Sequence, residues 1–324
     1  MSVQTTRIRP FAPADYPAFV AAADRTFPDY PWSVEEMRHQ DEAFDTSRFF
    51  KIRLVAEEDG AIVGAAEAGH RPSRFDPESY RFDLWVVPER RRRGHGSSLH
   101  DAVIAALRAR DGRVARGATK ESLHDGTTFL GKRGWKELKR DWESRLTVAG
   151  FDFPKFAGAD ERVANEGIRI STYADELARD PETPRKAYDL IEVCRRDAPA
   201  TDAATPVTFE EWRAEWVEAP GFLPDAFFVA ISAEGNWLGM SNLFESSGDK
   251  SFVWQGLTGV RRAARGKGIA MALKLRTVKH AQGLRVDHIK TWNDQSNRPM
   301  LAINEAMGFE KQPAWITFEY PLRP

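Results

Sequence analysis

The sequence predicts two copies of an α+β domain, each a mixed, mostly antiparallel sheet flanked by helices. The chain has 324 residues, which is the length of about two domains of roughly 150 residues each. A turn at residues 91–96 recurs at residues 265–270 with the spacing Arg-x-x-Gly-x-small. Each copy of the turn comes after an apolar strand pattern and before a helical one. Strands followed by a strand-helix-strand order indicate a mixed sheet with helices on its faces.

The repeat extends well beyond this turn. Four landmarks recur in the same order at an offset of 174 or 175 positions, which is typical of a duplicated domain. They are Gly64 with Gly239, Gly94 with Gly268, Gly134 with Gly308, and the segment 33–36 with 208–211. We therefore expect one domain over residues 1–149, a linker over 150–167 and a second domain over 168–324.

Each half begins with the same elements. A short strand comes first, and a helix with apolar residues at helical spacing follows it. Ser33 and Thr208 each stand three residues before a glutamate, the spacing of a capping box that starts a second helix. Two strands joined by a glycine-containing turn then form a hairpin. The strands and first helices are expected at 6–10, 14–23, 53–56 and 62–68, and again at 168–173, 184–196, 227–231 and 237–244.

The second part of each half surrounds the Arg/Gly turn. A strand leads into the turn, and a helix with an apolar stripe follows it. A further strand, a short helix that ends in Gly-Trp or Gly-Phe, and a last strand complete the pattern. The elements next to the turn are expected at 80–87, 98–110 and 113–118, and at 251–260, 271–281 and 286–291.

Composition excludes several classes of partner. Forty-seven Lys and Arg residues against 48 Asp and Glu give a net charge of −1, so no overall field attracts nucleic acid or an anionic membrane. No apolar run approaches the roughly 20 residues of a membrane helix, and the first residues lack a signal-peptide core. We expect a cytoplasmic monomer or homodimer that binds neither membrane nor nucleic acid. Nucleic-acid binding by the local arginines is the alternative, and the single cysteine, Cys194, is interpreted as an incidental thiol.

The Arg/Gly turn is a candidate anion site. A strand that leads through glycine into a helix exposes backbone N–H groups at the helix N-terminus, and arginines add positive charge. A phosphate group is the expected ligand, and a solvated tight turn is the alternative. A Walker A loop is excluded because Lys267 is followed by Gly268, and a dinucleotide fingerprint because Leu99 and Met271 replace its third glycine. Acidic residues and histidines lack metal-ligand spacing, so no metal is expected.

These residues resemble a known family. Residues 86–99 resemble motif A of the GCN5-related N-acetyltransferases (GNATs), and residues 258–270 resemble a second copy. Residues 129–135 and 304–309 resemble the end of motif B. The resemblance covers nearly the whole chain as a tandem pair. It implies a splayed strand pair in each half, where a strand holds the pantetheine of acetyl-CoA and the turn holds the pyrophosphate, with CoA as product.

The resemblance also implies which residues bind acetyl-CoA. In the first half they are Val86, Val87, Arg92, Arg93, Gly94, His95, Gly96 and Ser97. In the second half they are Thr258, Val260, Arg265, Gly266, Lys267, Gly268, Ile269, Ala270, Asn293, Asn297 and Asn304. The three asparagines have a second interpretation, because asparagine is also common in turns and helix caps.

Direct acetyl transfer needs a base for the amine and an acid for the departing thiolate. In many members of the family a tyrosine four residues before the Gly of motif B is this acid. Leu130 and Asn304 occupy that position here. Leucine has no proton to donate, whereas the amide of Asn304 can hydrogen-bond the sulfur, so the second half is expected to be the better catalytic candidate.

Candidate bases are few. Asp83 precedes the first turn, Glu67 and Glu245 stand near the ends of hairpin strands, and His288 lies on a strand beside Asp287. Each of these also has an interpretation as a structural or surface group. Tryptophans near the second helix of each half, such as Trp32, suit an apolar acceptor or simply the core.

The sequence therefore predicts an acyl-CoA N-acyltransferase. We expect it to transfer the acetyl group of acetyl-CoA to a primary amine of a small-molecule acceptor without a metal. The alternative is a non-catalytic acyl-CoA-binding or regulatory protein with degenerate acetyltransferase domains.

Overall fold

A computed structural model describes residues 6–199 and 202–323. The chain forms two compact units. Unit 1 contains the described residues up to Asp141 together with those from Pro313 onward, and unit 2 is Trp142–Gln312. Both units have a mixed sheet flanked by helices, which confirms the fold class expected from the sequence.

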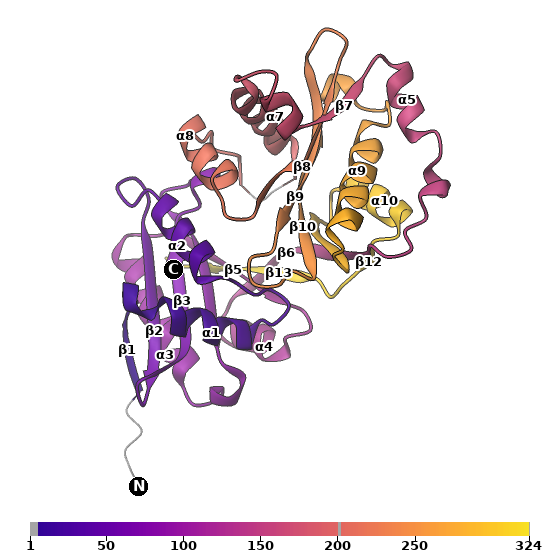
Figure 1. Cartoon of the computed structure of the whole chain (residues 1–324). Helices are drawn as coiled ribbons and strands as arrows, with labels where there is room; N and C mark the ends of the chain where they lie inside the picture. Colours follow the sequence, from indigo (N-terminus) through magenta and orange to yellow (C-terminus); the bar gives the residue numbers. More distant parts are fainter. Residues whose placement is uncertain (1–5, 200–201, 324) are drawn as a thin grey trace. The chain divides into compact units, whose positions relative to one another are not determined.

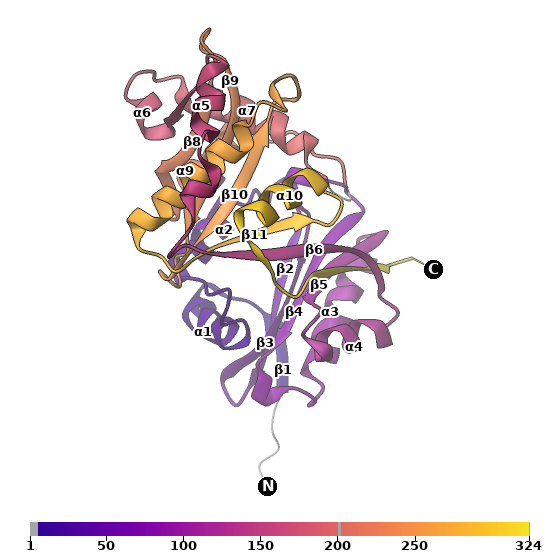
Figure 2. The ribbon, with the colours of Figure 1, turned by 90° about the vertical axis from the view of Figure 1, so that its right-hand side faces the viewer.

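Unit 1 has its strands in the order β1-β2-β3-β4-β5-β13-β6. Neighbouring strands are antiparallel except β4 and β5, which are parallel. Figure 2 shows α1 on one side of this sheet, and α3 and α4 on the other. The elements are β1 (Thr6–Pro10), α1 (Tyr16–Thr26), α2 (Val34–Ala43), β2 (Lys51–Glu58), β3 (Ala61–Gly69), β4 (Ser79–Val86), α3 (His95–Ala109), β5 (Val114–Lys120), α4 (His124–Lys132), β6 (Lys136–Thr147) and β13 (Trp315–Pro321).

Unit 2 repeats this plan with the strand order β6-β11-β10-β9-β8-β7, and β12 also pairs with β6. In Figure 1, α7 and α8 lie on one side of its strands, and α9 and α10 lie on the other. The elements are α5 (Ala159–Asn165), β7 (Arg169–Thr172), α6 (Tyr173–Leu177), α7 (Thr183–Asp197), α8 (Phe209–Trp212), β8 (Phe222–Ile231), β9 (Trp237–Glu245), β10 (Phe252–Val260), α9 (Ile269–Leu284), β11 (His288–Asp294), α10 (Arg298–Met307) and β12 (Glu310–Lys311). A π-helical turn, Arg213–Val217, follows α8.

The last strand of the second half belongs to unit 1, and the last strand of the first half is shared by the two units. β13 lies between β5 and β6 of unit 1 and pairs with β5 from Trp315 opposite Lys120 to Pro321 opposite Val114. β6 continues past Asp141 into unit 2, where it neighbours β11 and pairs with β12. The expected boundaries therefore differ from the structural ones, because sequence similarity between the halves carries no information on which sheet a strand joins.

The expected linker, residues 150–167, is also structured. It contains a 3-10 turn, Phe153–Phe156, and helix α5. Val163 of α5 is 1% exposed and packs in a core of unit 2. This segment was expected to be a connection because of its glycines and proline, but its apolar residues are buried and make it part of unit 2.

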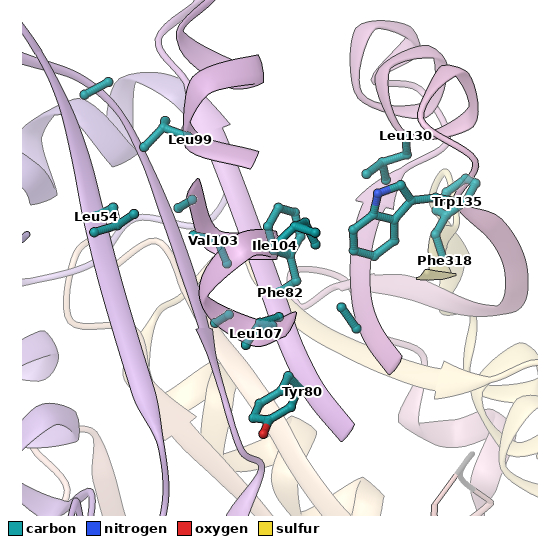
Figure 3. Close-up of a cluster of buried hydrophobic side chains, with 14 of the residues drawn as sticks. Leu54, Tyr80, Phe82, Leu99, Val103, Ile104, Leu107, Leu130, Trp135 and Phe318 are labelled. Atoms are coloured by element: carbon teal, nitrogen blue, oxygen red, sulfur yellow. The ribbon is translucent and has the colours of Figure 1, made fainter. Parts of the chain in front are cut away.

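Helix ends and core positions follow the sequence pattern. The Ser33 side chain accepts a hydrogen bond from the Glu36 N–H at 3.0 Å, and Thr208 and Glu211 form a complete capping box. In α3, Leu99, Val103 and Leu107 are fully buried at helical spacing. Figure 3 shows these three side chains in the core of unit 1.

One helix buries a lysine. Lys274 of α9 is 1% exposed, and its Nζ lies 3.4 Å from Gln255 Oε1 and 4.6 Å from the centroid of the Phe309 ring. Burial lowers the pKa of Lys274 to about 7, because the ammonium loses its water. The equivalent residue of α3 is His100, which accepts a hydrogen bond from Trp135 Nε1 at 3.2 Å. Both halves thus place a titratable group against the aromatic ring that follows the glycine of motif B.

Replacing Lys274 by Met is expected to stabilise the protein at neutral pH. The unfolded lysine holds its proton up to its ordinary pKa of 10.5, whereas the folded one releases it from about pH 7. The free energy of unfolding of the wild-type protein therefore rises with pH between about 7 and 10.5. The free-energy cost of burying the charged Lys274 is fully present below pH 7 and still nearly complete at pH 7. We expect Lys274→Met to raise the free energy of unfolding by about 2–4 kcal/mol at pH 7 and by much less near pH 10. Chemical denaturation measures this, and Lys279→Met, an exposed lysine of the same helix, should change little. A variant less stable than wild type at pH 7 would contradict the interpretation.

Candidate active site

A cavity of about 980 Å³ lies in unit 1. Its walls come from β3, β4, β5, the segment between α1 and α2, the Arg/Gly turn, and α4. Trp315, from the first position of β13, completes the wall. Every lining residue belongs to unit 1, so this cavity is complete within one unit.

The cavity opens where two parallel strands diverge. β4 and β5 pair over four positions, from Ser79 opposite Val114 to Phe82 opposite Gly117. β4 then continues to Val86 and β5 to Lys120, and residues from both extensions line the cavity. This is the splayed strand pair that the resemblance implies, and its unpaired edges leave backbone groups available to an extended ligand.

The turn after β4 forms one end of the cavity. Gly94 is the N-cap of α3 with φ +91°, a left-handed conformation that glycine adopts without strain. Because glycine has no side chain, no cap side chain accepts hydrogen bonds from the first N–H groups of this 15-residue helix. Arg91 Nε donates to the Val86 carbonyl at 3.1 Å and fixes the turn. The turn thus combines helix N–H groups and guanidinium groups beside a cavity, which suits a phosphate ligand.

Two carboxylates face these arginines. Glu58 is 4% exposed, and its oxygens lie 3.2 Å from Arg90 Nε and 3.6 Å from Arg93 Nη1. Asp125 of α4 lies 3.8 Å from Arg91 and 3.9 Å from Arg92. The Asp125 contacts are longer than hydrogen bonds, so the Nη groups of Arg91 and Arg92 can be rearranged towards a ligand.

Of the first-half residues expected to bind the cofactor, most line the cavity. Those that do are Val86, Arg92, Gly94, His95, Gly96 and Ser97. Val87 lies instead in the core and is 1% exposed, and Arg93 is held by Glu58. Val87 comes directly after the last residue of β4, and its side chain packs in the core of unit 1 instead of the cavity.

The other end of the cavity carries a ladder of charged side chains. Arg53, Glu67 and Asp83 lie directly opposite one another on β2, β3 and β4, and all three line the cavity. Glu67 Oε2 accepts from Arg53 Nε at 2.5 Å, and Asp83 pairs with Arg81 Nε at 2.5 Å. Side chains directly opposite on neighbouring strands share a face, so the sheet presents two adjacent carboxylates to the cavity.

Asp41 of α2 holds this ladder in place. Its carboxylate accepts hydrogen bonds from both Arg53 Nη atoms at 2.6 and 3.0 Å, from Lys51 Nζ at 2.5 Å and from the Tyr16 hydroxyl at 2.7 Å. Burial opposes the charged form, but these hydrogen bonds outweigh it and lower the pKa of Asp41 to about 2. Asp41 therefore fixes Arg53, which in turn orients Glu67.

The second Arg/Gly turn has a different environment. Asp197, at the end of α7, pairs with Arg262 at 2.7 Å and with Arg265 at 2.6 Å, and Glu166 pairs with Lys267 at 2.7 Å. The chain's own carboxylates thus neutralise three cations of this turn at hydrogen-bond distance. A ligand phosphate would have to compete with these carboxylates for the same donors.

Neighbouring side chains also occupy the space around this turn. A Cβ at Gly268 would lie 2.9 Å from Arg162 Cδ, so the aliphatic part of Arg162 covers the N-terminus of α9. A Cβ at Gly259 would lie 2.5 Å from the Cβ of Cys194, so β10 packs tightly on α7. Burial raises the pKa of Cys194 to about 11, and the thiol is a core group. A cavity of about 210 Å³ borders Gly268 and Arg162.

The remaining second-half candidates bond to one another or pack in the core. Thr258 Oγ1 lies 2.8 Å from Ser241 Oγ, and Asn304 Nδ2 donates to Asn293 Oδ1 at 2.7 Å. Asn297 caps α10, and its Oδ1 accepts from the Met300 N–H at 3.4 Å. Ile269 is buried with Val260 packed against it, whereas Gly266 and Ala270 belong to the turn and the first residues of α9.

The candidate acids and bases are separated by the fold. Glu245, at the end of β9, pairs with Lys250 at 2.8 Å in unit 2, and His288 starts β11 in the same unit. Asp83 and Glu67 come together in the cavity of unit 1. Leu130 lies in the core beside Trp135, as Figure 3 shows, and also reaches the cavity wall.

Sequence reasoning missed two residues of the wall. Tyr30 lies between α1 and α2, where no repeated landmark draws attention to it. Trp315 reaches the cavity only because β13 joins unit 1. The alternation of apolar residues in 315–321 predicts a strand. The sequence does not indicate its partner strand, because Lys120, which lies opposite Trp315, is nearly 200 positions earlier in the chain.

Comparison with known proteins relates the chain to acetyltransferases. Residues 16–130 match the model of the acetyltransferase (GNAT) family. The chain is 25% identical over 268 residues to a mycothiol acetyltransferase of Thermomonospora curvata, covering 83% of this chain and 82% of that protein. It is 26% identical over 280 residues to the mycothiol acetyltransferase of Thermobifida fusca, covering 81% and 80%.

Solved structures share the fold over the whole chain. A tandem GNAT protein from the clavulanic acid biosynthesis pathway has a TM-score of 0.75 and 19% identity, with 99% of both chains covered. A GCN5-related N-acetyltransferase from Sphaerobacter thermophilus has a TM-score of 0.67 and 20% identity, with coverage of 98% and 96%.

The fold, the splayed strands and the family match define an acyltransferase. The GNAT family model matches residues 16–130, which lie in unit 1, and the fold of the chain is similar to that of a tandem GNAT protein over 99% of its length. The resemblance drawn from the motifs is thereby confirmed, as is the class of enzyme. GNAT proteins generally use acetyl-CoA, and the turn of unit 1, with its glycine cap, helix N–H groups and arginines, fits the pyrophosphate of that molecule.

Two kinds of feature are absent from the described residues. Within residues 6–199 and 202–323, no cluster of three or more His, Cys, Asp or Glu side chains has a geometry suited to a metal ion. Over the same ranges, none of the helices is both long and apolar enough to span a membrane.

Asp41→Asn is expected to destabilise unit 1 at neutral pH. The folded pKa of Asp41 is about 2 against an ordinary 3.8, so its stabilisation is present above pH 3.8 and is lost as the pH falls towards 2. We expect a loss of about 2 kcal/mol at pH 7 that disappears near pH 2. Denaturation at several pH values measures it, with Glu42→Gln, an exposed residue of the same helix, as control. An equal loss at both extremes of pH would show that charge is not the cause.

Proposed function

We propose that this protein transfers the acetyl group of acetyl-CoA to a primary amine of a small-molecule acceptor, and that unit 1 carries out the reaction. The observation that supports this most is the cavity of unit 1, which joins the Arg/Gly turn to the charged ladder through the splayed strands. Its volume of about 980 Å³ is at the upper end of the range of small-molecule sites. The mycothiol acetyltransferases named above also act on a small molecule, as their name states.

Each end of the cavity has a role in this proposal. The turn and α3 bind the pyrophosphate, and β4 and β5 hold the pantetheine between their unpaired edges. Acetyl-CoA supplies an activated acyl thioester. Glu67 and Asp83 accept the hydrogens of the acceptor amine and take up the proton that the nitrogen must lose. Trp32 and Met37 add apolar surface to the wall next to the ladder.

The assignment to unit 1 differs from the expectation that the second half is the better catalyst. That expectation rested on Asn304, whose amide bonds Asn293 within unit 2. The cations of the second turn are already paired with Asp197 and Glu166. We therefore propose one acetyl-CoA site per chain.

Matched substitutions in the two turns test this assignment. Gly96 and Ala270 are equivalent residues in the first turn of α3 and α9. A Cβ at Gly96 meets only ordinary contacts at 3.5 Å or more, so a side chain is tolerated there and a carboxylate would repel the pyrophosphate. Isothermal titration with acetyl-CoA should show one site per wild-type chain, binding at least 50-fold weaker in Gly96→Glu and unchanged in Ala270→Glu.

Two sites per chain, or loss of binding in Ala270→Glu alone, would contradict the assignment to unit 1. No binding to the wild-type protein would remove the proposed cofactor altogether. Thermal melting of both variants separates a local effect from unfolding.

The carboxylate pair is tested by amide substitutions. Glu67→Gln and Asp83→Asn keep the size of each side chain but cannot take a proton, and we expect each to lower kcat/KM for the amine by about 100-fold. Thiol release with acetyl-CoA and a panel of small amines measures this, and acetyl-CoA binding should be unchanged. Asp189→Asn, an exposed residue of α7, is the control. The proposal fails if both amide variants keep more than a third of wild-type activity, or if Glu245→Gln is the variant that loses it.

A further inference from the structure

Tyr30 is held by two hydrogen-bond donors in the wall of the cavity. Its hydroxyl accepts from Lys120 Nζ at 2.9 Å and lies 3.3 Å from Trp315 Nε1. The Tyr30 and Trp315 rings meet edge to face with centroids 5.4 Å apart. Lys120 is only 9% exposed, and its Nζ lies 3.9 Å from Asp29 Oδ2. A buried ammonium and an indole N–H thus converge on one phenol oxygen.

This arrangement stands at the diverging end of β5. Lys120 is the last residue of that strand, and Trp315 lies directly opposite it on β13. Ala118, two residues before Lys120 and therefore on the same face of β5, lines the cavity together with Tyr30 and Trp315, so Tyr30 stands at the β5 wall of the splay. Under the proposed function, this splay is the place where the thioester lies.

Acetyl transfer to an amine leaves a thiolate that must gain a proton. A phenol, with an ordinary pKa near 10, is well matched to a thiol, with an ordinary pKa near 8.5. Hydrogen bonds donated to the phenol oxygen stabilise its deprotonated form and so make it a better acid. Leu130, at the position where the family carries its tyrosine, has no proton to donate.

We propose that Tyr30 protonates the sulfur of CoA, and that Lys120 and Trp315 are the positioning residues that stabilise its phenolate. The bond between the amine nitrogen and the acetyl carbon forms, and the bond from that carbon to sulfur breaks. The sulfur takes the hydroxyl proton of Tyr30. The nitrogen loses one proton to Glu67 and Asp83, from which it reaches water, and water returns a proton to Tyr30. The inference rests on the proposed function of unit 1.

Other proton donors in the wall are less suited. Ser122 and Thr119 carry aliphatic hydroxyls, which are far weaker acids than a phenol. His124 starts α4 and is exposed, whereas Tyr30 is half-buried beside its two donors. His124 is the competing candidate that the experiment has to separate.

The test combines kinetics with a binding measurement that needs no acceptor. With acetyl-CoA and the best amine of the panel, Tyr30→Phe should lower kcat by about 100-fold while KM for acetyl-CoA stays within twofold. Titration with CoA and with desulfo-CoA, which lacks the sulfur, should show about fivefold weaker CoA binding in Tyr30→Phe and unchanged desulfo-CoA binding. Lys120→Met should lower kcat by about tenfold, again with KM for acetyl-CoA unchanged.

Two variants serve as controls. Tyr188→Phe removes a hydroxyl that donates to the Val207 carbonyl in unit 2, and it should keep wild-type kinetics. His124→Asn should keep kcat within threefold. The proposal is overturned if Tyr30→Phe keeps kcat within threefold, if His124→Asn is the variant that loses it, or if Tyr30→Phe weakens CoA and desulfo-CoA equally.

The two proposals fail in different ways. If the wild-type protein binds acetyl-CoA but acetylates no amine of the panel, the proposed function is contradicted. The proposed contact between Tyr30 and the sulfur is then tested by the binding of CoA and desulfo-CoA alone. Equal affinities of the wild-type protein for the two ligands would overturn the contact. A melting temperature within a few degrees of wild type shows that Tyr30→Phe is folded.

Discussion

The pairing of β13 with β5 and β6 is the interaction on which the organisation of the chain depends. Seven residues, Trp315–Pro321, pair with β5 and complete the sheet of unit 1. Without them β5 and β6 would each expose an unpaired edge, which is costly in a buried sheet. The same pairing brings Trp315 to the cavity and to the hydroxyl of Tyr30. Neither half of the sequence therefore contains a whole unit, and the cavity depends on both ends of the chain.

The duplicated turn shows which part of the fold the two halves keep and which they changed. In both copies an arginine donates to the carbonyl of the last strand residue, Arg91 to Val86 at 3.1 Å and Arg265 to Val260 at 3.0 Å. Both helices begin after a glycine with positive φ. The backbone is thus the same, and the difference lies in the counter-charges. Asp197 lies 2.6–2.7 Å from two arginines of the second turn, whereas Glu58 and Asp125 lie 3.2–3.9 Å from the arginines of the first. A phosphate site is therefore defined as much by the carboxylates around it as by the turn.

Much of the fold follows from local sequence, and much of the site does not. Helix starts at Ser33 and Thr208, the hairpins and the strand before each turn were predicted because each depends on residues a few positions apart. The turn that is the candidate anion site was found for the same reason. The place of β13 depends on pairing across the length of the chain, and the neutralised second turn depends on Asp197, 68 positions before Arg265. Neither leaves a mark in a single sequence, because any strand pattern or any acidic residue would look the same.

The charge balance of the ladder bears on the form in which an amine can react. Lys51, Arg53 and Arg81 supply three positive charges, and Asp41, Glu67 and Asp83 supply three negative ones. An acceptor that kept its ammonium proton would bring one uncompensated charge into a partly buried site, whereas a neutral amine would not. A balanced ladder thus favours the neutral amine, which is the nucleophilic form. Under the proposed function, the carboxylates accept the amine's hydrogens because the arginines hold them in place, and the same arginines weaken their attraction for an ammonium. Arg53 therefore has two effects on Glu67. Its hydrogen bonds to Asp41 and Glu67 fix the position of the Glu67 carboxylate, and its positive charge balances the negative charge of that carboxylate.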